Sequence, residues 1–115
     1  MRKKTFTLPQ TILNYYHASE VYDDELLEEC FAKDALLVDE GEEYHGPKAV
    51  SAHIMKANRS ANVTTEITNC VENNEETVVT GTIAGDFEGS PVPLDFHFTL
   101  HNEKIKTLRI EIAGE

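Results

Sequence analysis

The second half of the chain alternates between apolar and polar residues, and this period of two constrains the fold more than any other feature. Four alternating stretches follow one another from residue 63: "VTTEITNCVE", "TVVTGTIAGDF", "PVPLDFHFTL" and "KIKTLRIEIA". Such alternation is typical of strands with one buried face. The breaks "NNEE", "EGS" and "HNE" are short, so they predict hairpins and an antiparallel meander. Gly81 and Gly85 stand inside the second stretch and predict a bulge or bend that curves the sheet.

The first half instead repeats its apolar residues at helical spacing. One helix is predicted over residues 11–22 after Pro9, a second after an N-cap at Asp23 or Asp24, and a third over 46–59 with Pro47 at its first position. The predicted inner faces are Ile12, Tyr15, Tyr16 and Ser19, then Leu26, Leu27, Cys30 and Phe31, and finally Val50, His53, Ile54 and Ala57. The acidic run "EGEEY" (40–44) and "NNEE" (73–76) are interpreted as solvated loops.

Three helices followed by a curved antiparallel sheet predict an α+β fold. The helices would cover one face of a cone-like sheet and enclose a pocket between the two layers. The length of 115 residues fits a single domain over residues 1–115.

Composition and net charge argue against some classes of binding partner. The formal net charge is −11, from 10 basic and 21 acidic residues, which repels phosphate backbones and anionic lipid and so argues against nucleic-acid or membrane partners. The start "MRKKTFTLPQ" has the basic cluster Arg2-Lys3-Lys4 but lacks the apolar stretch of a signal peptide. We therefore expect a cytoplasmic protein. Cys30 and Cys70 are isolated, which argues against a disulfide framework or a zinc site.

Three motifs and the order of the elements resemble the SnoaL-like branch of the nuclear-transport-factor-2-like superfamily, relatives of polyketide cyclases and ketosteroid isomerases. The motifs are "YDDELLEECFAKDALLVDE", "HGPKAVSAHI" and "NEKIKTLRI". The resemblance covers nearly the whole chain and implies a small-molecule pocket protein. The superfamily contains isomerases, cyclases, dehydratases, hydrolases and non-catalytic binders, so the fold does not settle the activity.

The resemblance to ketosteroid isomerases also implies candidate catalytic residues. Asp39 falls at the position of the proton-shuttling base, Tyr15 at that of the oxyanion-hole tyrosine, and Asp95 at that of the protonated acid. Such chemistry needs a carboxylate over an acidic C–H and a hydrogen-bond donor at the carbonyl oxygen. It requires no cofactor and no metal.

Asp39 ends the apolar run "LLV", and two interpretations of it stay open. Alternation places Leu37 and Asp39 on one strand face. If that face lines the pocket, Asp39 projects into it and Leu37 contacts the ligand. Otherwise Asp39 is a strand-end carboxylate in water. We favour the first interpretation and predict Asp39 in a cavity between helices and sheet, with Tyr15 or Tyr16 within reach.

Two interpretations, one functional and one structural, also stay open for each remaining candidate residue. Tyr16 is either a ligand contact or a core tyrosine, and His53 is either a pocket acid–base group or a core histidine. Asp95 and His97 share a strand face opposite Leu94 and Phe96. They either form a polar patch in the pocket or face outward. His97 and His101 lack a third ligand at regular spacing, so no metal site is predicted.

These observations support three functions. The first is a cofactor-independent isomerase or lyase acting on a small apolar carbonyl compound, with Asp39 as base. The second is a non-catalytic small-ligand binding domain, and the third is a dimerisation module. We also predict a homodimer through the outer sheet face, because alternation gives both faces apolar residues: Val78 opposes Val79, and Ile105 opposes Leu108.

Overall fold

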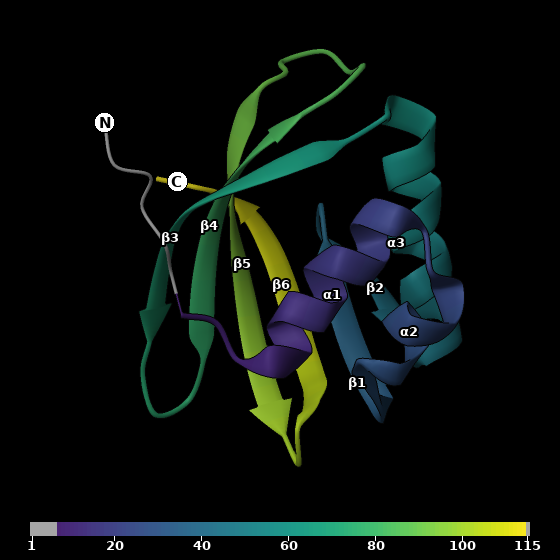
Figure 1. Cartoon of the computed structure of the whole chain (residues 1–115), viewed down its shortest axis with the longest axis vertical. Helices are drawn as coiled ribbons and strands as arrows, with labels where there is room; N and C mark the ends of the chain where they lie inside the picture. Colours follow the sequence, from purple (N-terminus) through teal and green to yellow (C-terminus); the bar gives the residue numbers. More distant parts are fainter. Residues whose placement is uncertain (1–6, 115) are drawn as a thin grey trace.

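A computed structural model describes residues 7–114, in which three helices lie against one face of a six-stranded curved sheet (Figure 1). The cluster Arg2-Lys3-Lys4 lies outside the described residues. The elements are α1 (Gln10–Val21), α2 (Asp24–Glu29), β1 (Phe31–Asp39), β2 (Glu42–His45), α3 (Pro47–Ala61), β3 (Thr64–Glu72), β4 (Thr77–Ala84), β5 (Val92–His101) and β6 (Lys104–Ile112). The predicted α+β class is confirmed.

The sheet order is β2-β1-β6-β5-β4-β3. Strands β3 to β6 form the antiparallel meander that the alternating pattern predicts. Strand β1 adds to β6 in parallel, which places Asp39 beside Ile110. This pair joins residues far apart in the sequence, and it places the end of the first strand alongside the edge of the meander.

The interpretation of residues 40–44 as a solvated loop is wrong, because Glu42–His45 forms β2 on the edge of β1. Glu40 and Gly41 make the connecting turn and both have left-handed backbone angles, with φ of 52° and 79°. A two-residue turn of this kind matches the twist of paired strands. The hairpin therefore follows from local turn chemistry rather than from apolar patterning.

The second helix ends earlier than the sequence predicts. The Asp23 side chain caps α2 by accepting a hydrogen bond from the Leu26 amide at 3.1 Å. The helix stops at Glu29, and Phe31 opens β1 instead of continuing the helical stripe. Pairing of Phe31 with Ile105 of β6 draws this backbone into the sheet, while the ring stays buried.

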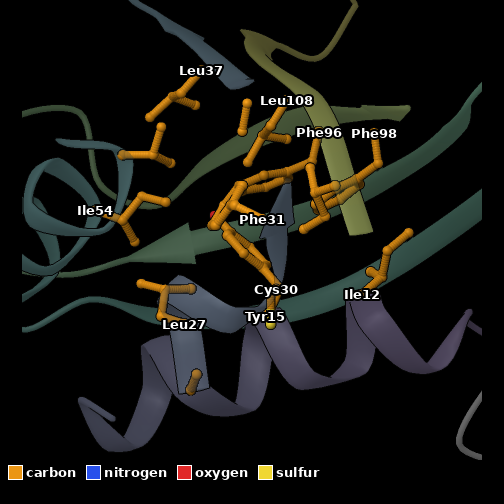
Figure 2. Close-up of a cluster of buried hydrophobic side chains, with 14 of the residues drawn as sticks. Ile12, Tyr15, Leu27, Cys30, Phe31, Leu37, Ile54, Phe96, Phe98 and Leu108 are labelled. Carbon is orange, nitrogen blue, oxygen red and sulfur yellow. The ribbon is translucent and has the colours of Figure 1, made fainter. Parts of the chain in front are cut away.

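The core lies between the helices and the inner face of β5 and β6 (Figure 2). Tyr15 of α1 packs edge-on against Phe98 of β5, with ring centroids 5.3 Å apart. The largest fully buried side chains are Phe98, Ile12, Leu27, Leu37, Ile105, Leu108, Val50 and Val79. They come from helices and strands alike, so burial of these side chains holds the two layers together.

The outer face of the sheet is less apolar than alternation suggests. Ile105 and Leu108 are both fully buried, because the β5–β6 register shifts between Thr99 and Leu100. The expectation that Ile105 and Leu108 lie on opposite faces is therefore wrong. A bulge adds one residue to a strand and reverses the alternation beyond it.

Candidate functional site

A cavity of about 950 Å³ opens between the helices and the inner face of the sheet. Its apolar and aromatic wall includes Tyr15, Tyr16, Ile54, Ile83, Leu94 and Phe96. The volume suits a small organic molecule, and a mostly apolar wall with few polar groups is typical of ligand sites.

Asp39 and His53 meet at the wall of this cavity. The Nε2 atom of His53 lies 2.8 Å from Oδ2 of Asp39, and the two side chains are 25% and 24% exposed. Asp39 is the last residue of β1, and His53 stands in the middle of α3. An ionised carboxylate only accepts hydrogen bonds, so the His53 Nε2–H donates to it. The pair combines a proton acceptor with a group that fixes its orientation.

Tyr44 packs against the ring face of His53. The Tyr44 ring, carried by β2, stacks on the imidazole with centroids 4.0 Å apart and an interplanar angle of 18°. Sequence reasoning missed this residue because it assigned residues 40–44 to a loop. The signal that identifies it is the Glu40-Gly41 turn, which is typical of a tight hairpin.

Tyr15 and Tyr16 line the same cavity as the pair and carry phenol hydroxyl groups. Burial raises the pKa of the Tyr15 hydroxyl, and the negative charge of Asp39 raises that pKa further. Burial also raises the pKa of Tyr16, with smaller contributions from Tyr15 and Cys70. Both phenols therefore stay protonated at neutral pH and are able to donate. Among residues 7–114, the buried Tyr16 hydroxyl has no hydrogen-bond partner.

The structure brings together four of the seven candidate residues. Asp39, Tyr15, Tyr16 and His53 all line the cavity. Leu37 is fully buried in the core and is not part of the cavity wall, although it shares a strand face with Asp39.

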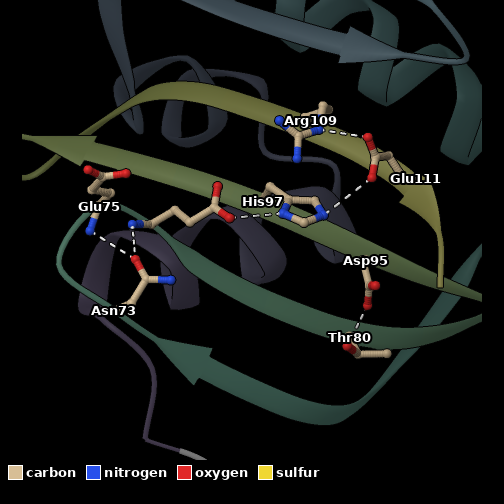
Figure 3. Close-up of polar contacts among 8 residues, drawn as sticks. Asn73, Glu75, Thr80, Asp95, His97, Arg109 and Glu111 are labelled. Atoms are coloured by element: carbon tan, nitrogen blue, oxygen red, sulfur yellow. Dashed lines mark hydrogen bonds and ion pairs between the residues drawn. The ribbon is translucent and has the colours of Figure 1, made fainter. Parts of the chain in front are cut away.

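Asp95 and His97 face away from the cavity. The Thr80 hydroxyl donates to Asp95 Oδ1 at 2.6 Å, and His97 lies between Glu76 at 3.3 Å and Glu111 at 3.5 Å (Figure 3). Their strand neighbours Leu94 and Phe96 line the cavity instead. Asp95 and His97 therefore both face outward. The pairing of β5 with β4 has no register shift, so the alternation of faces along β5 is unbroken at these two residues.

The loop between β4 and β5 completes the cavity wall with Phe87, Glu88 and Gly89. It is fastened to the end of α3, since the Asp86 amide donates to the Ala61 carbonyl at 2.6 Å and Asn62 Nδ2 donates to Asp86 Oδ2 at 2.8 Å. A Cβ at Gly85 would lie 2.6 Å from the same carbonyl oxygen. Glycine is therefore required for this close approach, at the predicted bend where the chain leaves β4.

The sequence matches the SnoaL-like domain family over residues 12–108. The chain belongs to the SnoaL-like family. None of the helices within residues 7–114 of this SnoaL-like domain has the length and apolar character needed to cross a bilayer. No curated protein matches the sequence.

Solved structures show the same fold. A proposed polyketide cyclase from Sinorhizobium meliloti is 31% identical over 90% of this chain and 95% of its own, with a TM-score of 0.86. A protein with a ketosteroid isomerase-like fold from Catenulispora acidiphila, solved with trimethylamine, is 20% identical over 94% and 88%, with a TM-score of 0.80. A proposed SnoaL-like polyketide cyclase from Jannaschia is 14% identical over 96% and 92%, with a TM-score of 0.76.

Proposed function

We propose that this SnoaL-like domain binds a small apolar carbonyl compound and catalyses proton transfer next to the carbonyl, as a cofactor-independent isomerase or lyase. The observation that carries the proposal is the 2.8 Å contact between Asp39 and His53 at the wall of a mostly apolar cavity. Tyr15 lines the same cavity with a hydroxyl that stays protonated. A base and a donor therefore face one ligand volume.

The roles follow from the chemistry of the groups. The Asp39 carboxylate takes a proton from the carbon beside the carbonyl, and the electron pair moves into the carbonyl to form an enolate. Tyr15 donates a hydrogen bond to the enolate oxygen, which carries the new charge. His53 keeps the carboxylate oriented through its Nε2–H. The protonated Asp39 then returns the proton to another carbon in an isomerisation, or to a departing group in an elimination.

A base and a hydrogen-bond donor held in these positions should make the reaction much faster than it is in solution. A positioned general base contributes about 10²–10⁴ in rate, and a single well-placed donor to the developing oxyanion contributes about 10²–10³. Among the similar structures, one is a proposed polyketide cyclase and another was solved with the small molecule trimethylamine. These similarities support a small-molecule site in this cavity.

The test is the isomerisation of 3-cyclohexenone to its conjugated isomer, followed by ultraviolet absorbance. We expect wild-type protein to accelerate it and Asp39→Asn to lose roughly 10²-fold or more. Asp95→Asn makes the same substitution on the outer face and serves as the matched control. Isomerisation that is no faster than in buffer, or equal rates for wild type and Asp39→Asn, would overturn the proposal.

Ligand binding without turnover is the second candidate. Asp95 faces outward, so the cavity does not assemble the full set of three groups that the resemblance to ketosteroid isomerases implies. In that case cyclohexenone would shift the NMR signals of Tyr15 and Ile54 without being isomerised.

A further inference from the structure

Most of the charged groups around the cavity are negative. Four carboxylates, Asp39, Glu40, Glu88 and Glu111, contribute to its wall. Among the described lining residues, Arg109 is the only Arg or Lys. Its Nε donates to Glu111 at 2.7 Å, and both side chains lie beside His97 on the outer sheet face (Figure 3). That ion pair is neutral, so the remaining wall carries a formal charge of −3.

The three carboxylates outside the Arg109–Glu111 pair occupy different depths. Glu40 in the β1–β2 turn and Glu88 in the β4–β5 loop are exposed, which places them at the mouth. Asp39 is 24% exposed and lies further in, beside His53. The cavity wall therefore carries two carboxylates at its solvent-exposed edge and one further in.

We propose that this cavity selects its ligand by charge: it accepts small apolar molecules that are neutral or carry a protonated amine, and it rejects carboxylates and phosphates. Low-dielectric walls focus the field of like charges into a cleft. Aromatic lining residues such as Tyr16 and Phe96 also offer ring faces to a cation. The inference rests on the proposed function, in that it assigns a substrate class to the same cavity.

Three probes that share a benzyl group isolate the charge. N,N-dimethylbenzylamine is cationic at neutral pH, phenylacetamide is neutral and phenylacetate is anionic, and all three have similar shapes. Binding is measured by two-dimensional NMR of labelled full-length protein at low salt, with Tyr16, Ile54 and Phe96 as cavity reporters. We expect the amine to bind roughly tenfold more tightly than the carboxylate, with the amide between them.

Two double variants test whether the mouth causes this order. Glu40→Gln with Glu88→Gln removes two charges at the mouth. Glu20→Gln with Glu72→Gln removes two exposed charges that do not line the cavity. The first pair should reduce the preference for the amine several-fold, whereas the second should leave it nearly unchanged because distant exposed charges are screened.

Each result of these binding experiments supports or contradicts a specific claim about the cavity. Phenylacetate binding as tightly as the amine, or the amine failing to shift the cavity signals, would overturn the inference. Equal effects of the two double variants would overturn the role of the mouth. The binding order requires no turnover, so it is read independently of the isomerisation assay. A carboxylate preference with active isomerisation would refute only the charge selection, and the expected order without isomerisation would refute only the enzymatic proposal.

Discussion

The carboxylate of Asp39 and the imidazole of His53 lie 2.8 Å apart, although one ends a strand and the other stands in the middle of a helix 14 residues later. The hairpin turn after Asp39 and the start of α3 at Pro47 return the chain to this point. The contact is therefore a product of the tertiary fold. It places two titratable groups at one wall of an otherwise largely apolar cavity.

Asp39→Asn should leave the fold intact. The Asn side-chain oxygen still accepts the hydrogen bond from His53, so we expect a thermal midpoint within a few degrees of wild type at neutral pH. Asp23→Ala is the comparison, because loss of that α2 cap costs about 1 kcal/mol. A drop for Asp39→Asn larger than that for Asp23→Ala would show that Asp39 is a structural acceptor, whose loss costs about 1–3 kcal/mol.

Tyr44 should act as a positioning residue for His53. Tyr44→Phe keeps the stacked ring, so activity should stay near wild type. Tyr44→Ala frees the imidazole and should lower kcat roughly tenfold with little change in KM, because misplacement of a reacting group slows chemistry more than binding. Equal kcat values for Tyr44→Ala and Tyr44→Phe would contradict this role.

Stability should fall at alkaline pH. Burial raises the pKa of the Cys30 thiol from its usual 9.0 to about 11, and burial also raises the pKa values of Tyr15 and Tyr16. The folded state therefore keeps these protons after the unfolded state has released them. The free energy of unfolding consequently decreases as pH rises above about 9.

Thermal unfolding from neutral pH to about pH 10.5 checks this direction. Cys30→Ala should begin with a lower midpoint, because it removes a buried side chain, but should lose less stability with rising pH. A wild-type midpoint that stays constant or rises across this range would contradict the prediction.

The homodimer remains a prediction, based on Val78 and its neighbours on the outer face and no longer on Ile105. Ile105 is buried in the core, but cross-strand pairing places Val71, Val78, His97 and Arg109 in one row on the outer face. Light scattering should give twice the mass of one chain. Val78→Lys should produce monomers, whereas Val21→Lys on the exposed side of α1 should not. A monomeric wild type at micromolar concentration would end the prediction.

Local patterns predicted the parts of the fold that depend on neighbours in sequence. Alternation and short breaks identified β3 to β6, and Pro47 marked the start of α3. The parallel pairing of β1 with β6 escaped prediction, because neither strand's pattern specifies a partner some 70 residues away. The burial of both Ile105 and Leu108 escaped it for a related reason, since a register shift is invisible in an alternating pattern.

In the candidate site too, local sequence patterns identified single residues but not the contacts between them. Asp39 was identifiable because a carboxylate interrupts an apolar strand, and His53 because it shares a helical stripe with Ile54 and Ala57. Their direct contact depends on how α3 packs against β1, which no local pattern encodes. For Asp95 the strand alternation indicated the outward face, whereas the aligned position in the resembling isomerases indicated a catalytic role. The structure follows the alternation.

Exchange of the α-protons of cyclohexanone in heavy water, followed by NMR, tests proton transfer at Asp39 most directly, since it requires no leaving group and no rearrangement. Wild-type protein and Asp95→Asn should exchange these protons well above the buffer rate. Asp39→Asn should fall close to the buffer rate, and His53→Ala should lie between them. Exchange by Asp39→Asn at the wild-type rate would contradict the assignment of Asp39 as the base.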